Sequence, residues 1–557
     1  MQASNKSLRF VHKGLYLAKN KRTGLRDSCM EPNENNKKSC TNSETSAKLA
    51  TFHPVATCYY GNAAILTFLA FYFFIIPFCI VIHYLADPGL KEEGIPRFAF
   101  RLHRSLSTRY ERWASNRVIS GQAEQLSIED IAGTEWPLFG SVFYLLGTEA
   151  IQQAWEKNNS LSNVAPKVYA AGAIKAAVEL VVDPGHAAWI KQHWGKDYLH
   201  RENVFYRMLL ISAVTSYQKL LGDEKYLSLL RDQIETLSKE LDESPYGLLD
   251  DYPGQCYPTD VVAAIAAIRR ADAVLGTDHS DFIKRSVRSF KGRLVDYTGI
   301  PPYRADSTTG IIGRARGCSS QWFTVWTPQL WPEYAKQWYK SFEKYFWQKH
   351  WIAVGFREFP KDTSNIEWSQ WYIDVDSGPV IAGYGLAASA FGIGAARANG
   401  RFDHAYPLTT EAIALSWPLP YGTLAWPRIL SNTTHAPYIG EAAVLFALTR
   451  TPMEGSEITI GSHVPVIVYL ALASYLGIGI VSVLAAFATL RRRKKQVSKK
   501  RIPLGNIQIA AWIILLTAGV AVSATYNLAA GLLLILLAQF LPRGRKKTVG
   551  ENNHYCA

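Results

Sequence analysis

Positive charge is concentrated at the two ends of this 557-residue chain, next to long hydrophobic segments. Residues 1–60 carry ten Lys or Arg against four Asp or Glu, and residues 490–557 carry twelve against one. The formal net charge is +14, which leaves residues 61–489 nearly neutral at −3. Because Lys and Arg are retained on the cytoplasmic side of membrane spans, this distribution indicates membrane topology. It does not indicate a nucleic-acid-binding surface.

Two segments, 61–86 and 464–489, are apolar and long enough to cross a hydrocarbon core of about 30 Å. No small-residue cleavage site follows the first segment, so we expect a retained span and not a signal peptide. A third apolar block, 508–541, is interrupted near its middle by Ser523, Thr525, Tyr526 and Asn527. The interruption predicts two short spans joined by a tight turn, and one tilted span is the alternative.

The basic segments 490–507 and 542–557 lie on the same side of a membrane only if an even number of spans separates them. We therefore expect four spans in a plasma or inner membrane, with both termini cytoplasmic and residues 95–455 outside the cytoplasm. The predicted partner of the basic segments is the anionic surface of the lipid bilayer. Residues 1–60 are polar and are predicted to be disordered.

Residues 95–455 contain many Ala- and Leu-rich helical stretches and almost no alternating strand pattern, which predicts an all-α domain. Amphipathic outer helices are expected at 221–241 and 280–297. Mostly apolar inner helices are expected to begin at regular intervals of about 56 to 68 residues, near positions 135, 203, 260, 316, 376 and 437.

Intervals of this size correspond to helical hairpins, and six of them predict an (α/α)6 toroid. An open solenoid of helix pairs is the alternative. We favour closure because polar and aromatic residues cluster at one end of each inner helix. In a closed ring those ends meet at one pocket, whereas in a solenoid they form a row.

Carboxylates occur at three of the expected helix starts, and we interpret them as candidate general acids and bases. Asp at a helix start also caps free backbone N–H groups and complements the helix dipole. For Asp260 or Asp376 taken alone, capping is the favoured interpretation. The candidate catalytic carboxylates are Glu135, Asp251, Asp260, Asp374 and Asp376.

Aromatic residues accompany these carboxylates, a combination that suits sugars or other neutral organic substrates. The candidate substrate-binding aromatics are Trp136, Tyr252, Tyr257, Trp322, Trp371, Tyr372 and Trp426. Arg316 is a candidate for holding an anionic group at the rim of the pocket. His200, beside Glu202 at the second inner helix, is a candidate general acid or base, and a hydrogen-bonded structural histidine is the alternative.

Several common catalytic signatures do not occur in the sequence. It contains no His, Asp and Glu cluster with metal-ligand spacing, no nucleophile elbow, no phosphate loop and no dinucleotide fingerprint. No metal or cofactor is therefore predicted. Gly383-Tyr384-Gly385 is expected inside a helix as a point of close packing. Cys256 and Cys318 are the only cysteines of the predicted outer domain, either bridged or as two free thiols.

The order of these motifs resembles the linalool dehydratase-isomerase family of (α/α)6 toroids over roughly residues 120–450. The resemblance rests on Glu135-Trp136-Pro137, His200 with Asn203, Tyr257-Pro258-Thr259-Asp260, and Asp374 to Pro379. It implies addition or removal of water at an allylic alcohol, by two cysteines nine residues apart with a histidine and acidic or tyrosine partners. Here Asp251 and Asp260 occupy that spacing, and His200 occupies the expected histidine position.

Three functions follow as hypotheses. The first is a membrane-anchored enzyme that uses carboxylate acid–base catalysis on a glycan or lipid-linked sugar. Many inverting glycosidases share the toroid, and such enzymes need two carboxyl groups about 6.5–9.5 Å apart; Glu135 with Asp260 or Asp376 is the expected pair. The second is a hydro-lyase or isomerase acting on an alkenyl alcohol. The third is a non-catalytic binding module of an envelope or polysaccharide system.

Overall fold

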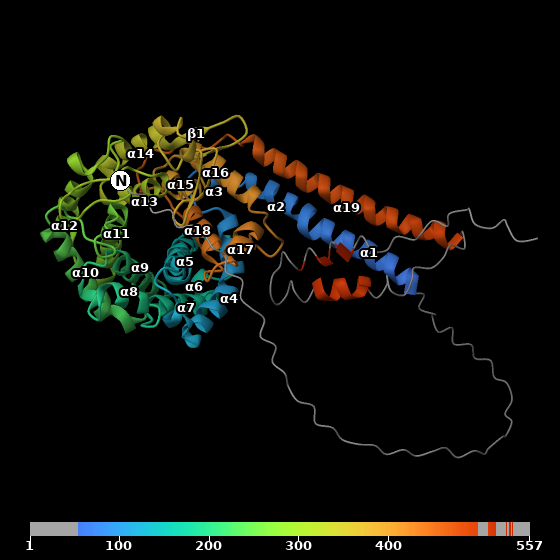
Figure 1. Cartoon of the computed structure of the whole chain (residues 1–557), viewed down its shortest axis with the longest axis horizontal. Coiled ribbons are helices and arrows are strands. Elements are labelled where there is room, and N and C mark those ends of the chain that lie inside the picture. Colours follow the sequence, from blue (N-terminus) through green and yellow to red (C-terminus); the bar gives the residue numbers. More distant parts are fainter. Residues whose placement is uncertain (1–53, 499–510, 520–530, 532–533, 536, 539–557) are drawn as a thin grey trace, which may run out of the picture. The chain divides into compact units, whose positions relative to one another are not determined.

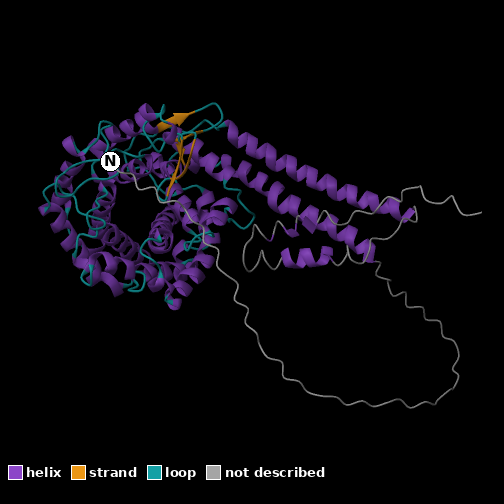
Figure 2. Ribbon diagram, viewed as in Figure 1, coloured by secondary structure: helices purple, strands orange, loops and turns teal. Residues whose placement is uncertain are grey.

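The computed structural model describes residues 54–498 and 511–519, together with residues 531, 534–535 and 537–538. The described part of the chain is mostly helical, as the sequence predicts (Figures 1 and 2). Residues 1–53 of the predicted disordered tail, most of the third apolar block and the final basic segment lie outside these residues. The end of that tail, residues 54–60, is helical instead, as the start of α1 (Pro54–Ala70).

One group of helices is predominantly apolar and buried: α5 (Ile131–Lys157), α9 (Val204–Leu221), α11 (Pro258–Leu275), α13 (Gly317–Leu330), α15 (Leu386–Ala398) and α18 (Ile439–Leu448). Each of these helices packs against the next one in this order, and α18 packs against α5. The close approach of α18 to α5 requires Gly147, because a methyl group there would lie 2.8 Å from the Leu445 side chain.

A second group of helices packs on the outside of the first: α4 (Arg97–Ser120), α7 (Ala171–Val182), α10 (Leu227–Glu243), α12 (Ser280–Ser286), α14 (Pro332–Phe346) and α16 (Phe402–Leu415). These helices are more amphipathic. In α10 the buried residues Leu230, Ile234, Leu237 and Leu241 recur at helical spacing and form one apolar stripe. The remaining short helices are α3 (Pro88–Lys91), α6 (Pro166–Tyr169), α8 (Ala188–Trp194) and α17 (Ala425–Ser431).

The predicted outer helices are shorter than expected. The segment 221–241 divides, because α9 ends at Leu221 and α10 begins at Leu227. The segment 280–297 is α-helical only as far as Ser286 and continues as short 3₁₀ turns. The β-branched residues and glycine that follow Ser286 are weak helix formers, which is consistent with this early end.

Five short strands interrupt the helical pattern within residues 347–385: β1 (Trp347–Lys349), β2 (Val354–Phe356), β3 (Trp371–Asp374), β4 (Gly378–Ile381) and β5 (Tyr384–Gly385). Strands β1 and β2 form one antiparallel hairpin, and β3, β4 and β5 form a three-stranded antiparallel sheet. Trp371 lies opposite Ile381 and Asp374 lies opposite Gly378. Figure 2 shows these strands in orange.

The expectation that Asp374 and Asp376 begin an inner helix is therefore wrong. Both residues belong to the β3–β4 hairpin, and α15 begins ten residues after Asp376, at Leu386. The aromatic and β-branched residues of β3 favour a strand, and Gly378 adopts a positive φ of 61° at the end of the turn. Gly383, expected inside a helix, has a φ of 84°, and an added methyl group would collide with the guanidinium of Arg357.

Two helices are long and apolar enough to cross a membrane, within the residues that the structure describes. The first runs through α1 (Pro54–Ala70), a π-helical turn η1 (Phe71–Ile75) and α2 (Ile76–Leu85), and the second is α19 (Val466–Ser498). Their apolar stretches cover Tyr60–Leu85 and Val466–Arg491, close to the predicted 61–86 and 464–489. Helix α19 also continues through the first part of the segment predicted as a basic loop.

Arg397 connects the end of the first apolar helix to the buried helices. Its side chain is fully buried in α15 and donates hydrogen bonds to the carbonyl oxygens of Gly89 at 3.0 Å, Arg450 at 2.9 Å, and Gly94. Burial lowers the pKa of Arg397 to about 10. The guanidinium thus fixes the segment that follows the first apolar helix.

Replacing Arg397 by Met should lower the free energy of unfolding by about 3 kcal/mol or more, because buried carbonyl groups would lose their donors. Arg285→Met is the matched control, since Arg285 is half-exposed and pairs with Asp242 near the surface. That change should cost less than about 1 kcal/mol. Thermal unfolding of both purified variants in the same detergent measures the difference, and equal melting temperatures would contradict the assignment.

Candidate active site

A cavity of about 970 Å³ lies where the N-terminal halves of the buried helices meet. Loops 252–257 and 303–304, the β3–β4 turn and parts of α16 and α17 complete its wall. The wall includes these residues predicted from the sequence: Glu135, Trp136, Tyr252, Tyr257, Asp260, Trp322, Asp376 and Trp426.

The cavity has a polar part and an extended apolar part. Carboxylates and tyrosines come from α5, α11 and the loops at the helix starts. The rest of the lining is mainly aromatic and aliphatic, with Phe139, Phe143, Phe205, Phe391, Leu408, Leu415, Leu430 and Val444. Glu411 of α16 lies among these residues, and its backbone-bound carboxyl group has a pKa that burial raises to about 7. A ligand that fills this space therefore needs a long apolar portion and a small polar portion.

Glu135 lies one turn into α5 and accepts a hydrogen bond of 2.7 Å from the hydroxyl of Tyr252. Burial raises the pKa of Glu135 to about 7, with a contribution from nearby Asp376, although the Tyr252 hydrogen bond opposes the shift. A carboxyl group with a pKa near neutrality is suited to donate or accept a proton.

Asp260 lies in the first turn of α11, and Asp251 lies in the loop that leads to it. Asp251 does not line the cavity, is 1 % exposed, and accepts a hydrogen bond of 2.7 Å from the backbone N–H of Tyr257. Burial raises the pKa of both carboxyl groups, and their mutual repulsion adds to the shift for Asp251. Of the nine-residue pair, only Asp260 therefore faces the cavity, and Asp251 holds its loop through the Tyr257 N–H.

Asp376 lies in the exposed β3–β4 turn and accepts a hydrogen bond from the hydroxyl of Tyr303. The Tyr303 ring packs edge-on against that of Tyr257, with the ring centroids 5.3 Å apart. Arg304 donates a hydrogen bond of 2.6 Å to the Tyr257 hydroxyl. Asp376 and Tyr303 are thus joined across the mouth of the cavity, beside the Tyr257–Arg304 pair.

Asp374 and Arg316 hold this turn in place and do not line the cavity. One oxygen of Asp374 accepts hydrogen bonds from the N–H and hydroxyl of Ser377, at 2.7 and 2.6 Å. Its other oxygen accepts a 2.8 Å hydrogen bond from Arg316, which also pairs with the buried Glu358 at 2.6 Å. The guanidinium of Arg316, predicted to bind an anionic ligand, is therefore paired with two carboxylates of the protein itself.

The two thiols of the domain are separate. Cys256 and Cys318 are both free, which settles the open question of a disulfide between them. Cys318 lines the cavity and donates to Glu358 at 3.1 Å, and burial raises the pKa of both thiols well above the usual value. Neither thiol is activated as a thiolate.

His200 lies outside the cavity on a short 3₁₀ turn. Its side chain is 48 % exposed and contacts Asp197 at 3.1 Å and Asp232 at 3.2 Å, and these two carboxylates raise its pKa. His193, from α8, lines the cavity instead, with its ring centroid 5.2 Å from that of Tyr252. Burial lowers the pKa of His193 and favours its neutral form.

Trp371 and Tyr372, also predicted to bind substrate, do not line the cavity either. Trp371 is 63 % exposed on β3, and Tyr372 packs against Phe359. The expectation that they lie at a helix start is wrong, because both belong to strand β3.

Sequence reasoning missed several polar residues of the cavity lining: Tyr303, Arg304, His193, Gln321 and Glu411. Gln321 is 3 % exposed, and its Oε1 has no hydrogen-bond partner among the described residues. An acceptor of this kind suits a ligand hydroxyl group. The Tyr303-Arg304 pair follows two prolines in a loop, where no periodic pattern signals a site.

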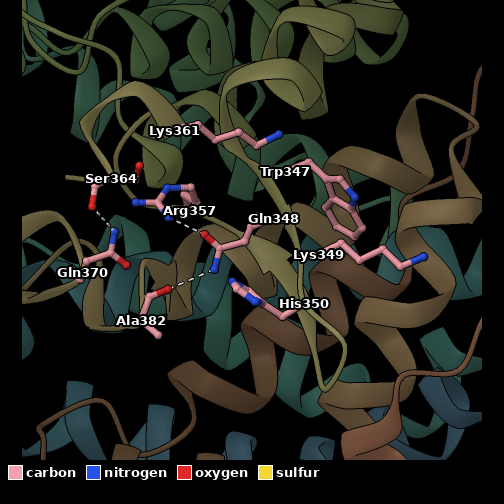
Figure 3. A pocket seen from close by; sticks show the side chains of 9 residues that line it. All are labelled: Trp347, Gln348, Lys349, His350, Arg357, Lys361, Ser364, Gln370 and Ala382. Carbon is pink, nitrogen blue, oxygen red and sulfur yellow. Dashed lines mark hydrogen bonds between the residues drawn. The ribbon is translucent and has the colours of Figure 1, made fainter.

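A smaller pocket of about 560 Å³ lies beside β1, apart from this cavity (Figure 3). Its lining is basic and polar, with Lys349, His350, Arg357 and Lys361. Arg357 is buried and donates to the side chain of Gln348, which in turn donates to the Ala382 carbonyl at 3.0 Å. No Asp or Glu is among the described residues that line this pocket, so it is chemically distinct from the carboxylate-lined cavity.

No protein-family model matches the sequence, and no curated protein matches it significantly. The resemblance to linalool dehydratase-isomerase therefore stays a prediction. Among the described residues, no group of three or more His, Cys, Asp and Glu side chains is placed to hold a metal ion.

The pKa of Glu135 can be tested directly. Infrared difference spectra should show a carboxyl band that titrates near pH 7 and is missing in Glu135→Gln. Tyr252→Phe should move this titration to higher pH, because it removes the hydrogen bond that stabilises the ionised form. A Glu135 band that titrates near pH 4.5 in the unmodified protein would contradict the assignment.

Proposed function

We propose that this chain is a membrane-anchored acid–base enzyme that removes water from, or adds it to, an amphiphilic alkenyl alcohol. The observation that carries the proposal is the cluster of Glu135, Asp260 and Asp376 at the polar part of a large apolar cavity. The apolar wall suits a hydrocarbon chain, and the carboxyl groups suit a single hydroxyl group at its end.

In the dehydration direction, protonated Glu135 donates its proton to the substrate hydroxyl group. The carbon–oxygen bond breaks, its electron pair stays with oxygen, and water leaves a carbocation behind. Asp376 then accepts a proton from the neighbouring carbon, and the electrons of that C–H bond form the double bond. Trp322 and Phe139 line the cavity, and their aromatic rings stabilise the positive charge that develops on the substrate.

Asp260 has a third role, distinct from those of the acid Glu135 and the base Asp376. Burial and repulsion from Asp376 and Glu135 raise its pKa, which favours the protonated form. A protonated Asp260 can hydrogen-bond to the departing water without adding negative charge to the site. Hydration is the reverse sequence, in which the same groups exchange their roles.

The proposed fold is the (α/α)6 toroid. The cyclic order of contacts among the buried helices, with an outer helix beside each, supports it. In this proposal Asp251 and Asp260 occupy the places of the two cysteines implied by the family resemblance. His193 replaces His200 as the histidine that faces the site.

The proposed topology places residues 95–455 outside the cytoplasm and both termini inside, with four spans. The two long apolar helices and the terminal basic segments support it. A methyl group on Gly519 would lie 2.7 Å from Ile535. Such proximity across sixteen residues supports two spans over one, because one continuous helix would separate Gly519 and Ile535 by about 24 Å.

A second candidate is hydrolysis of a lipid-linked sugar, in which Glu135 and Asp376 act as acid and base across a glycosidic bond. The aromatic rings of Trp136, Tyr257 and Trp426 along the cavity favour it. The mainly apolar lining favours the alcohol, since a glycan needs hydrogen-bonding partners for each of its hydroxyl groups.

The catalytic assignment is tested with the full-length protein in phosphatidylcholine vesicles, supplied with linalool and longer isoprenoid alcohols. Gas chromatography should detect the dehydrated alkene. Glu135→Gln and Asp260→Asn should each lower the rate about 100-fold or more. Asp281→Asn, at a carboxylate that is 84 % exposed, is the matched control. Wild-type rates in both site variants would overturn the proposal, and release of sugar from lipid-linked glycosides would favour the second candidate.

The dehydration rate should also fall as the pH rises through about 7, because the Glu135 proton donor is then lost. Tyr252→Phe should shift this inflection to higher pH. A rate that instead increases through pH 7 would assign Glu135 the role of a base.

A further inference from the structure

We propose that the apolar part of the cavity opens into the bilayer through a portal formed by Leu415, Trp426 and Leu430, so that substrate enters from the lipid phase. The inference rests on the proposed function for the nature of the substrate. It rests separately on the geometry of the portal for the route of entry.

The three portal residues face both the cavity and the outside of the molecule. They line the cavity, and yet Leu415 is 44 % exposed, Trp426 is 48 % exposed and Leu430 is 57 % exposed. The neighbouring Tyr421 is 73 % exposed. Large apolar side chains exposed together mark a surface that contacts something other than water.

This surface is continuous with the two apolar helices. The indole N–H of Trp417 donates a 2.5 Å hydrogen bond to the Phe73 carbonyl oxygen, and the Trp417 ring lies 5.8 Å from that of Tyr475. Tyr475, in α19, also donates a 2.6 Å hydrogen bond to the Ala414 carbonyl oxygen at the end of α16. The loop that joins α16 to α17 is thus attached partway down the membrane helices.

The length of the apolar helices sets the depth of this loop. A hydrocarbon core of about 30 Å needs about 20 helical residues. If the cytoplasmic boundary of the core lies at Tyr60, its outer boundary lies at about residue 79. Phe73 then lies about 9 Å inside that outer boundary. Counted from Arg491, the core reaches about residue 472, so Tyr475 also lies inside it. The α16–α17 loop therefore enters the outer part of the hydrocarbon region, at the depth typical of interfacial segments.

The surfaces of α2 and α19 between this loop and the rest of the helical domain support the same depth. Ile82 on α2 and Tyr469 and Leu470 on α19 are each about half-exposed. An exposed tyrosine beside aliphatic residues is typical of the membrane–water interface. If the bilayer ended at Phe73, these apolar side chains would face bulk water.

The polar part of the cavity keeps its own opening to water. Val375 and Asp376 in the β3–β4 turn are exposed and also line the cavity. An apolar chain and a water molecule would thus enter by different routes. This separation suits a reaction in which water is one of the reactants or products.

The depth of the portal is tested with a fluorescent bimane label on Leu430→Cys in full-length protein, with the cysteines outside the 95–455 domain replaced by Ser. The protein is reconstituted in phosphatidylcholine vesicles. Lipids brominated on their acyl chains should quench the label at least about threefold more than aqueous iodide does. Ile311→Cys is the matched control, because Ile311 is apolar and 69 % exposed but lies far along the chain from the portal. Its label should respond to iodide.

Entry is tested with a diazirine-bearing hexadecanol dissolved in the same vesicles. Photolysis should place adducts on the cavity segments 386–393 and 439–444, and Leu430→Asp should reduce them about tenfold, since a charge in the hydrocarbon region opposes passage. Ile311→Asp should leave them unchanged.

Iodide quenching at position 430 that matches position 311 would overturn the portal, and so would equal adduct formation in Leu430→Asp. These measurements do not require turnover. If the quenching and adduct results contradict the portal while Glu135→Gln abolishes dehydration, the proposed function stands without the portal. If those results support the portal while Glu135→Gln is fully active, the proposed function is wrong and the portal stands.

Discussion

The structure depends on the mutual burial of helices that are apolar on most of their faces. A helix such as α11, with its Val, Ala and Ile residues, has no side that can face water, so it must be surrounded by other helices. The cyclic packing from α5 to α18 and back to α5 meets this requirement. It also brings the N-terminal ends of these helices together, and the polar residues at those ends then share one cavity.

Burial beside the cavity determines the chemistry of the carboxyl groups. Glu135 and Asp260 carry raised pKa values because they are removed from water and lie near other carboxylates. Asp376 differs because it lies in an exposed turn and accepts a hydrogen bond from Tyr303. The same kind of side chain therefore occurs in two buried environments and in one exposed, hydrogen-bonded environment around a single cavity.

Hydrogen bonds from side chains to backbone carbonyl oxygens attach the helical domain to the two long apolar helices. Tyr406 donates a 3.0 Å hydrogen bond to the Leu85 carbonyl oxygen, and Trp417 and Tyr475 make the further contacts described above. Arg397 fixes the chain between the first apolar helix and α4. These contacts fix the helical domain against the two long apolar helices, a condition that the proposed lateral portal requires.

Local patterns in the sequence determined the mostly helical class, the two long apolar helices, most of the inner-helix starts and the residues Glu135, Tyr252 and Asp260. Each of these follows from hydrophobic periodicity or from residues adjacent to a helix start. Only the tertiary structure placed Asp374 and Asp376 in a hairpin, exchanged His200 for His193, and added Tyr303 and Gln321 to the cavity. Those outcomes depend on which segments, distant in the chain, pack against one another, and no local pattern carries that information.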